Sequence, residues 1–136
     1  HLLILTNMTS IYFKIAGIVN LFGALLHTIA GQIELVNPLL DSNINIQQKA
    51  ELTGAWHIVT ILLFFTSYTI LKTAFRNDTA NRKEIKSIAI LYLFSGIPFM
   101  LSSLWFGVYA FQWILLIPIG ILLFIGLAKS GKKGQY

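Results

Sequence analysis

The sequence predicts an all-α integral membrane protein, a bundle of four transmembrane helices arranged as two helical hairpins. Of its 136 residues, 56% are hydrophobic and only 11% are charged, whereas soluble globular domains carry roughly 25% charged residues. Four apolar stretches are each long enough to cross a hydrocarbon core of about 30 Å, which takes about 20 helical residues. We therefore expect residues 1–136 to form a single membrane domain with no separate globular unit.

The first span is expected over residues 12–34. Its charged residues, Lys14 and Glu34, lie at its two ends. The apolar run is longer than the core of a cleaved signal peptide, which has about 7–15 residues, so we expect the segment to be retained. Met8 is a candidate natural start, and we assign no function to residues 1–7.

Three further spans follow. The second is expected over residues 52–71, which contain no charged residue. The stretch from Ser87 to Ala128 also lacks Asp, Glu, Lys and Arg, and as a helix it would be about twice as long as a bilayer core is thick. It therefore predicts a hairpin of two spans, residues 87–106 and 108–128, with its turn near Gly107. Aromatic residues flank this turn, as expected at a membrane interface: Trp105, Tyr109 and Trp113.

The positive charges predict that both termini are cytoplasmic, because cytoplasmic loops retain Lys and Arg. The expected outer loop, residues 36–50, contains only Lys49. The other basic residues fall on the opposite side of the membrane, many of them in the expected cytoplasmic loop over residues 72–86: Lys14, Lys72, Arg76, Arg82, Lys83, Lys86, Lys129, Lys132 and Lys133. We expect a multi-pass protein of the bacterial inner membrane, with a short interfacial helix in the outer loop and Thr79 or Asn81 capping the third span.

Two histidines lie inside the predicted spans. His27 precedes Glu34 by seven residues and His57 follows Glu51 by six, so both lie about 9–10 Å below the outer carboxylates on neighbouring antiparallel helices. Ionisable groups inside a membrane are costly, and they mark candidate functional sites. Each histidine belongs to a stripe of residues at helical spacing, and we expect the two stripes to face each other: Asn20, Gly23, His27, Gly31 and Glu34; Thr53, His57, Thr60, Phe64 and Tyr68.

Several ligands are compatible with such a histidine pair. His27 and His57 could bind a transition metal, with Glu34 or Glu51 completing the ligand set. They could also be the axial ligands of a haem, or line a pocket for a quinone or lipid headgroup with Trp56 stacking beside it. The ordinary alternative is a structural histidine that donates a hydrogen bond across a helix interface, for about 0.6 kcal/mol. The sequence leaves these alternatives open.

Missing motifs narrow the function classes. There is no Cys, which excludes disulfides and thiolate chemistry. The GxSxG, HExxH, Walker and Gly-rich dinucleotide motifs are absent as well, so we assign no catalytic residue. The excess of ten Lys and Arg over five Asp and Glu lies at helix ends and does not indicate nucleic-acid binding.

The leading hypothesis is a non-catalytic membrane protein. It either binds a small ligand or cofactor near the outer face at His27 and His57, or serves as an accessory subunit of a membrane complex, with the bilayer and other membrane subunits or further copies of itself as partners. The alternative is a small membrane enzyme in which His27 and His57 act as acid and base on a lipid or quinone. In that enzyme, Glu34 or Glu51 would orient the histidines.

Overall fold

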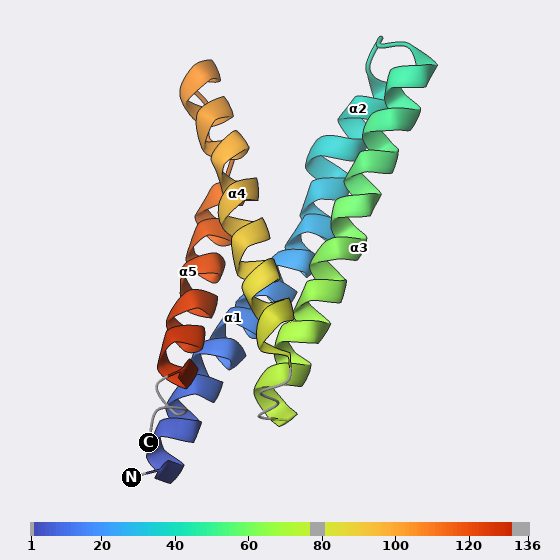
Figure 1. The fold of residues 1–136 in the computed structure, drawn as a ribbon. Coiled ribbons are helices and arrows are strands. Elements are labelled where there is room, and N and C mark those ends of the chain that lie inside the picture. Colours follow the sequence, from blue (N-terminus) through green and yellow to red (C-terminus); the bar gives the residue numbers. More distant parts are fainter. Residues whose placement is uncertain (1, 77–80, 132–136) are drawn as a thin grey trace.

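The computed structural model describes residues 2–76 and 81–131, which are almost entirely helical (Figure 1). The elements follow one another along the chain as α1 (Leu2–Gly31), a π-helical turn η1 (Gln32–Val36), α2 (Asn37–Asp41), α3 (Ile46–Arg76), α4 (Arg82–Phe106) and α5 (Gln112–Gly131).

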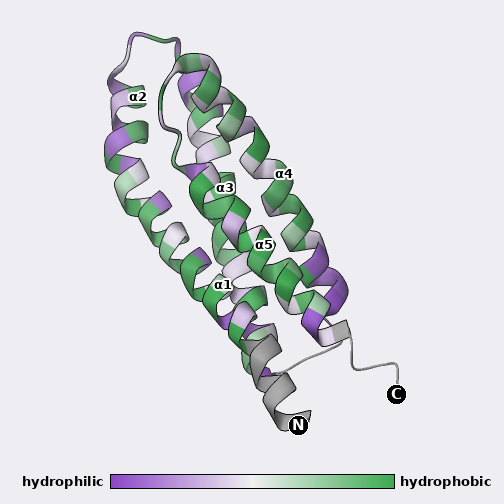
Figure 2. Cartoon of the chain, turned by 90° about the vertical axis from the view of Figure 1, so that its left-hand side faces the viewer, coloured by the Kyte–Doolittle hydropathy of each residue, from purple (hydrophilic) through white to green (hydrophobic). Residues whose placement is uncertain are grey.

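Four helical segments are long and apolar enough to cross a membrane: Ile11–Asp41, Ile46–Arg76, Arg82–Phe106 and Gln112–Ser130. Apolar residues dominate the middle of each segment (Figure 2). The predicted fold class is thereby confirmed, and the chain is a multi-pass membrane protein by the length and composition of its helices.

The helices extend well beyond the predicted spans. The expected outer loop over residues 36–50 is mostly helical, since α2 ends at Asp41 and α3 begins at Ile46. The expected cytoplasmic loop over residues 72–86 likewise contains the last turn of α3 and the first turn of α4. Hydropathy marks only the part of a helix that lies in hydrocarbon. Good helix formers such as Gln47 and Lys49 continue the same helix into the headgroup region.

The short helix α2 continues the spanning segment Ile11–Asp41 and is not a separate helix in the outer loop. Pro38 explains the π-helical turn that precedes it. Proline has no N–H, so Pro38 cannot donate to the carbonyl of Glu34 as an α-helix requires. Instead the N–H of Asn37 donates to the carbonyl of Gln32, five residues back.

After the short link at Ser42–Asn45, the Asn45 side chain accepts a hydrogen bond from the backbone N–H of Gln48 at 2.9 Å and caps α3.

The turn between the last two spans lies at the predicted position. Gly107 ends α4 in the left-handed conformation with a φ of 63°, which glycine adopts at no steric cost. Ser103 accepts the N–H of Ala110 at 2.9 Å and closes the turn. Asn81 precedes α4, but its side chain forms no capping hydrogen bond and instead donates to Thr73 at 3.4 Å. Thr79 lies outside the described residues.

The four long helices pack as two hairpins joined along one edge. α1 packs on α3 and α4 packs on α5, as predicted, and α1 also packs along α5. By contrast, α3 and α4 contact each other little and diverge away from the end at which α3 finishes (Figure 1). Glycines bring the paired helices close: a Cβ on Gly126 would lie 2.5 Å from the Phe13 ring, and one on Gly120 would lie 3.0 Å from the Ala89 carbonyl oxygen.

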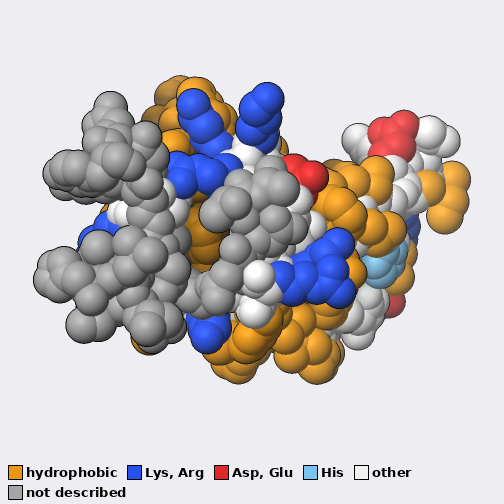
Figure 3. All heavy atoms as spheres, turned by 60° about the horizontal axis from the view of Figure 1, so that its bottom comes forward, with side chains coloured by type: hydrophobic (Ala, Val, Ile, Leu, Met, Phe, Trp, Pro, Cys, Tyr) orange, Lys and Arg blue, Asp and Glu red, His pale blue; other side chains and the backbone are white. Residues whose placement is uncertain are grey.

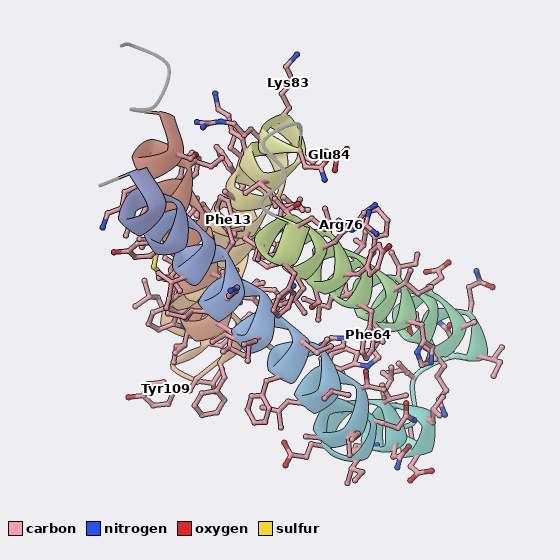
Figure 4. All side chains as sticks on the ribbon, turned by 90° about the horizontal axis from the view of Figure 1, so that it is seen from below. Phe13, Phe64, Arg76, Lys83, Glu84 and Tyr109 are labelled. Carbon is pink, nitrogen blue, oxygen red and sulfur yellow. The ribbon has the colours of Figure 1, made fainter. Side chains whose placement is uncertain are left out.

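The basic residues gather at the end where α1 begins and α5 finishes (Figures 1 and 3). Seen from this end, Arg76 and Lys83 point away from the bundle, whereas Phe13 points into its centre (Figure 4). Among the residues that the structure describes, no Lys or Arg forms a salt bridge; Arg82 donates to the Leu127 carbonyl and Lys129 to the Tyr12 hydroxyl. The positive-inside rule predicts that this end is cytoplasmic. We call the half of the bundle near it the inner half and the other the outer half.

Candidate functional site

His27 and Trp56 form a stacked pair where α1 meets α3 in the outer half. Their ring centroids are 3.8 Å apart and their planes differ by 12°. His27 Nε2 lies 3.4 Å from the Trp56 carbonyl oxygen, a long hydrogen bond in the tautomer that carries its proton on Nε2. A Cβ on Gly31 would clash with the Trp56 ring, so only glycine leaves room for the indole. His27 is thus held between two helices by stacking and by a backbone acceptor.

His57 lies in a different environment. The α1 stripe packs on α3 as expected, but it does so through Trp56, Leu63 and Thr66, whereas the predicted stripe residues His57, Phe64 and Tyr68 are exposed. His57 is exposed and forms no hydrogen bond within the described residues. Successive helical residues differ by about 100° in direction, so Trp56 points to α1 whereas its neighbour His57 points outward. Phe64, two turns further along the same face, lies on the side of α3 away from α4 (Figure 4).

The two carboxylates do not join the histidines. Glu34 is exposed in the π-helical turn, and Glu51 is exposed and accepts a hydrogen bond from Gln47 at 2.7 Å. In the part of the chain that the structure covers, no group of three His, Cys, Asp or Glu residues could hold a metal ion. A His-carboxylate metal set, one of the ligand sets suggested by the sequence, is therefore not assembled among these residues.

A second polar cluster, not predicted from the sequence, lies in the inner half where α1, α3 and α4 meet. Asn20, Thr66 and Tyr92 are all buried. Asn20 Nδ2 donates to Thr66 Oγ1 at 3.0 Å and to the Leu63 carbonyl at 3.3 Å, while Tyr92 donates to Asn20 Oδ1 at 2.8 Å. The Thr66 and Tyr92 hydroxyls are also hydrogen-bonded to each other. The cluster links the two hairpins and leaves none of its three side chains without a partner.

Counting could have found this cluster. Asn20 follows Lys14 by six residues, Thr66 precedes Lys72 by six, and Tyr92 follows Lys86 by six. At 1.5 Å per residue all three lie about 9 Å above the inner basic residues. His27 and His57 share a depth for the same reason.

One further polar atom near His57 has no partner. The Thr53 hydroxyl is shielded by surrounding atoms yet forms no hydrogen bond among the described residues. Thr53 lies one helical turn before His57, so a hydroxyl and an imidazole, both without a hydrogen bond, are neighbours on α3. The other polar side chains that α3 places near this level are engaged: Thr60 donates to the Trp56 carbonyl at 3.2 Å.

No protein-family model, no curated protein and no solved structure matches this chain.

Proposed function

We propose that this protein is a non-catalytic membrane subunit that works by associating with another membrane-spanning chain through the outer half of α3. The observation that carries the proposal is His57. It is exposed and forms no hydrogen bond within the described residues, although it lies inside a membrane span. It follows Glu51 by six residues, so it lies about 9 Å further along the helix axis than that carboxylate.

Several other intramembrane polar side chains are satisfied within the chain. Asn20, Thr66 and Tyr92 satisfy one another, and His27 is stacked on Trp56 and bonded to its carbonyl. A polar group facing lipid without a partner is costly, and intramembrane ionisable residues almost always face a protein interior or a water-filled cavity. A partner from outside the chain would supply the missing hydrogen bond to His57.

A small-ligand or cofactor site at His27 and His57 is the second candidate. It is supported by the unpartnered Thr53 hydroxyl beside His57. The enzyme alternative is less well supported, because His27 already bonds to a backbone carbonyl and Glu51 already accepts from Gln47. We also propose a bacterial inner membrane as the location. Helical spans with a basic cytoplasmic end are typical of that membrane, whereas proteins of the bacterial outer membrane typically span it as β-barrels.

The test is the composition of the particle extracted from native membranes with a lipid-preserving polymer. We expect wild-type protein to be extracted in an assembly larger than one chain, and His57→Leu to give a larger share of single-chain particles. His27→Leu serves as the control because it changes an intramembrane histidine on the other helix. A single-chain particle for the wild type would contradict the proposal.

An absorption spectrum and a metal analysis of the same wild-type sample test the second candidate. A haem band or a stoichiometric metal that disappears in the His27→Gln, His57→Gln double variant would favour the cofactor site. The subunit proposal predicts neither signal.

A further inference from the structure

Gly54 is a glycine without a visible reason inside its own chain. A Cβ built on each of the other helical glycines with described surroundings would have a neighbouring side chain within 3.5 Å, whereas a Cβ on Gly54 would meet nothing within 4 Å. Glycine in a helix interior costs about 1 kcal/mol relative to alanine. In membrane helices, small residues allow a second helix to approach closely. Gly54 therefore indicates a close neighbour that is not part of this chain.

Gly54 and His57 lie on one continuous exposed face of α3. Alternating steps of four and three residues define this face, which is the spacing of a left-handed helix pair. Every position on it is exposed: Ala50, Gly54, His57, Ile61, Phe64 and Tyr68. Ile61 and Tyr68 are 67% and 63% exposed. We call these six residues the α3 face.

From the α3 face we infer that the protein forms a parallel homodimer in which the two α3 helices cross at Gly54 and His57. This inference rests on the proposed function and names its partner as a second copy of this chain. The residues grow larger toward the cytoplasmic end, from Ala50 and Gly54 to Phe64 and Tyr68. The helices are therefore closest in the outer half and separate toward the inner half.

The chemistry of the α3 face favours a second copy over an unrelated helix. All copies have the same orientation in the membrane, so a twofold axis along the membrane normal brings the same residues together at the same depth. A neutral imidazole has one donor and one acceptor nitrogen, so the His57 of one copy can donate to the His57 of the other. Separation toward the inner half also keeps the two Lys72 side chains apart; in the single chain, Lys72 lies 5.7 Å above the Tyr68 ring.

Cysteine cross-linking in membranes tests the dimer directly, because these 136 residues contain no Cys. We expect Ile61→Cys to form a disulfide-linked dimer on mild oxidation. Leu62→Cys is the matched control at the same depth, since Leu62 is also exposed but points about 100° away. Ala50→Cys should cross-link at least as well as Ile61→Cys, and Tyr68→Cys less well. Equal cross-linking of Ile61→Cys and Leu62→Cys would overturn the inference.

Dimer affinity of the full chain in lipid bilayers gives a second readout. We expect Gly54→Leu to abolish most dimer, because the side chain would occupy the crossing point. His57→Leu should weaken the dimer roughly threefold to tenfold, the effect of losing one membrane hydrogen bond. His57→Gln should largely restore it, since Gln also carries a donor and an acceptor.

Two negative results separate this inference from the proposed function. A wild-type particle that contains one copy of this chain together with a different chain, and loses that chain in His57→Leu, would overturn the homodimer and leave the subunit proposal standing. A wild-type particle that contains only one copy and nothing else would overturn both.

Discussion

The inner and outer halves of this bundle differ in how their polar side chains are hydrogen-bonded. In the inner half, Asn20, Thr66 and Tyr92 come from three helices and satisfy one another where the hairpins meet. In the outer half the hairpins diverge (Figure 1), and there His57 has no hydrogen bond within the described residues. The inner half has the organisation of a completed interior, whereas the outer half of α3 carries the interface that we propose.

The glycines repeat this contrast. Gly120 and Gly126 lie where α5 packs closely against α4 and against α1, and each would clash with a neighbour if it carried a Cβ. Gly54 would not. A small residue in a membrane helix can therefore permit close packing within its own chain or close packing with a partner chain. The atoms that surround it show which of the two applies.

The largest expected effect comes from comparing Gly120→Leu with Gly54→Leu. At Gly120 a Cβ would already lie 3.0 Å from the Ala89 carbonyl oxygen, which is backbone and cannot rotate away, so overpacking should cost about 1–3 kcal/mol or more. At Gly54 the monomer should lose nothing and gain up to about 1 kcal/mol of helix propensity. Unfolding in mixed detergent micelles, at dilutions where the chain is monomeric, measures the change in the free energy of unfolding for both variants. Equal losses at the two sites would contradict the contrast between the halves.

A smaller effect is expected in the polar cluster. Asn20→Ala removes the partner of two buried hydroxyls and should destabilise the fold by roughly 1–2 kcal/mol. Tyr92→Phe should cost less, because Asn20 keeps its bond to Thr66. A double-mutant cycle between Asn20 and Tyr92 should give a coupling energy of about 0.6–1.7 kcal/mol. A coupling near zero would show that the cluster does not join the hairpins energetically, and Ser87→Ala, at an exposed site, is the control.

The smallest effect separates the two histidines. His27→Leu loses the stack on Trp56 and a long hydrogen bond, so the free energy of unfolding should fall by about 0.5–1.5 kcal/mol. His57→Leu replaces an exposed polar group in the apolar layer, so the monomer should be unchanged or slightly more stable. The measurement is the same micelle unfolding at monomeric dilution. If His57→Leu is the more damaging change, His57 has a partner within the chain and the proposed interface is wrong.

The sequence predicted the four long helices and the turn at Gly107. Residue counting succeeds here because the rise per residue is nearly constant in a helix. Loop boundaries were less predictable. Hydropathy falls where the chain leaves the hydrocarbon, but α3 continues from Ile46 to Arg76 across that limit.

Rotation about each helix axis was decided only by the tertiary structure. Trp56 and His57 are adjacent in sequence and about 100° apart in direction, so which one faces α1 depends on how α1 and α3 pack. Gly31 makes room for the Trp56 ring, which fixes that choice and turns His57 outward. Hydropathy and spacing predict which residues share a depth or a face. They do not determine which face meets a neighbouring helix, because that depends on the shapes of all the side chains between the helices.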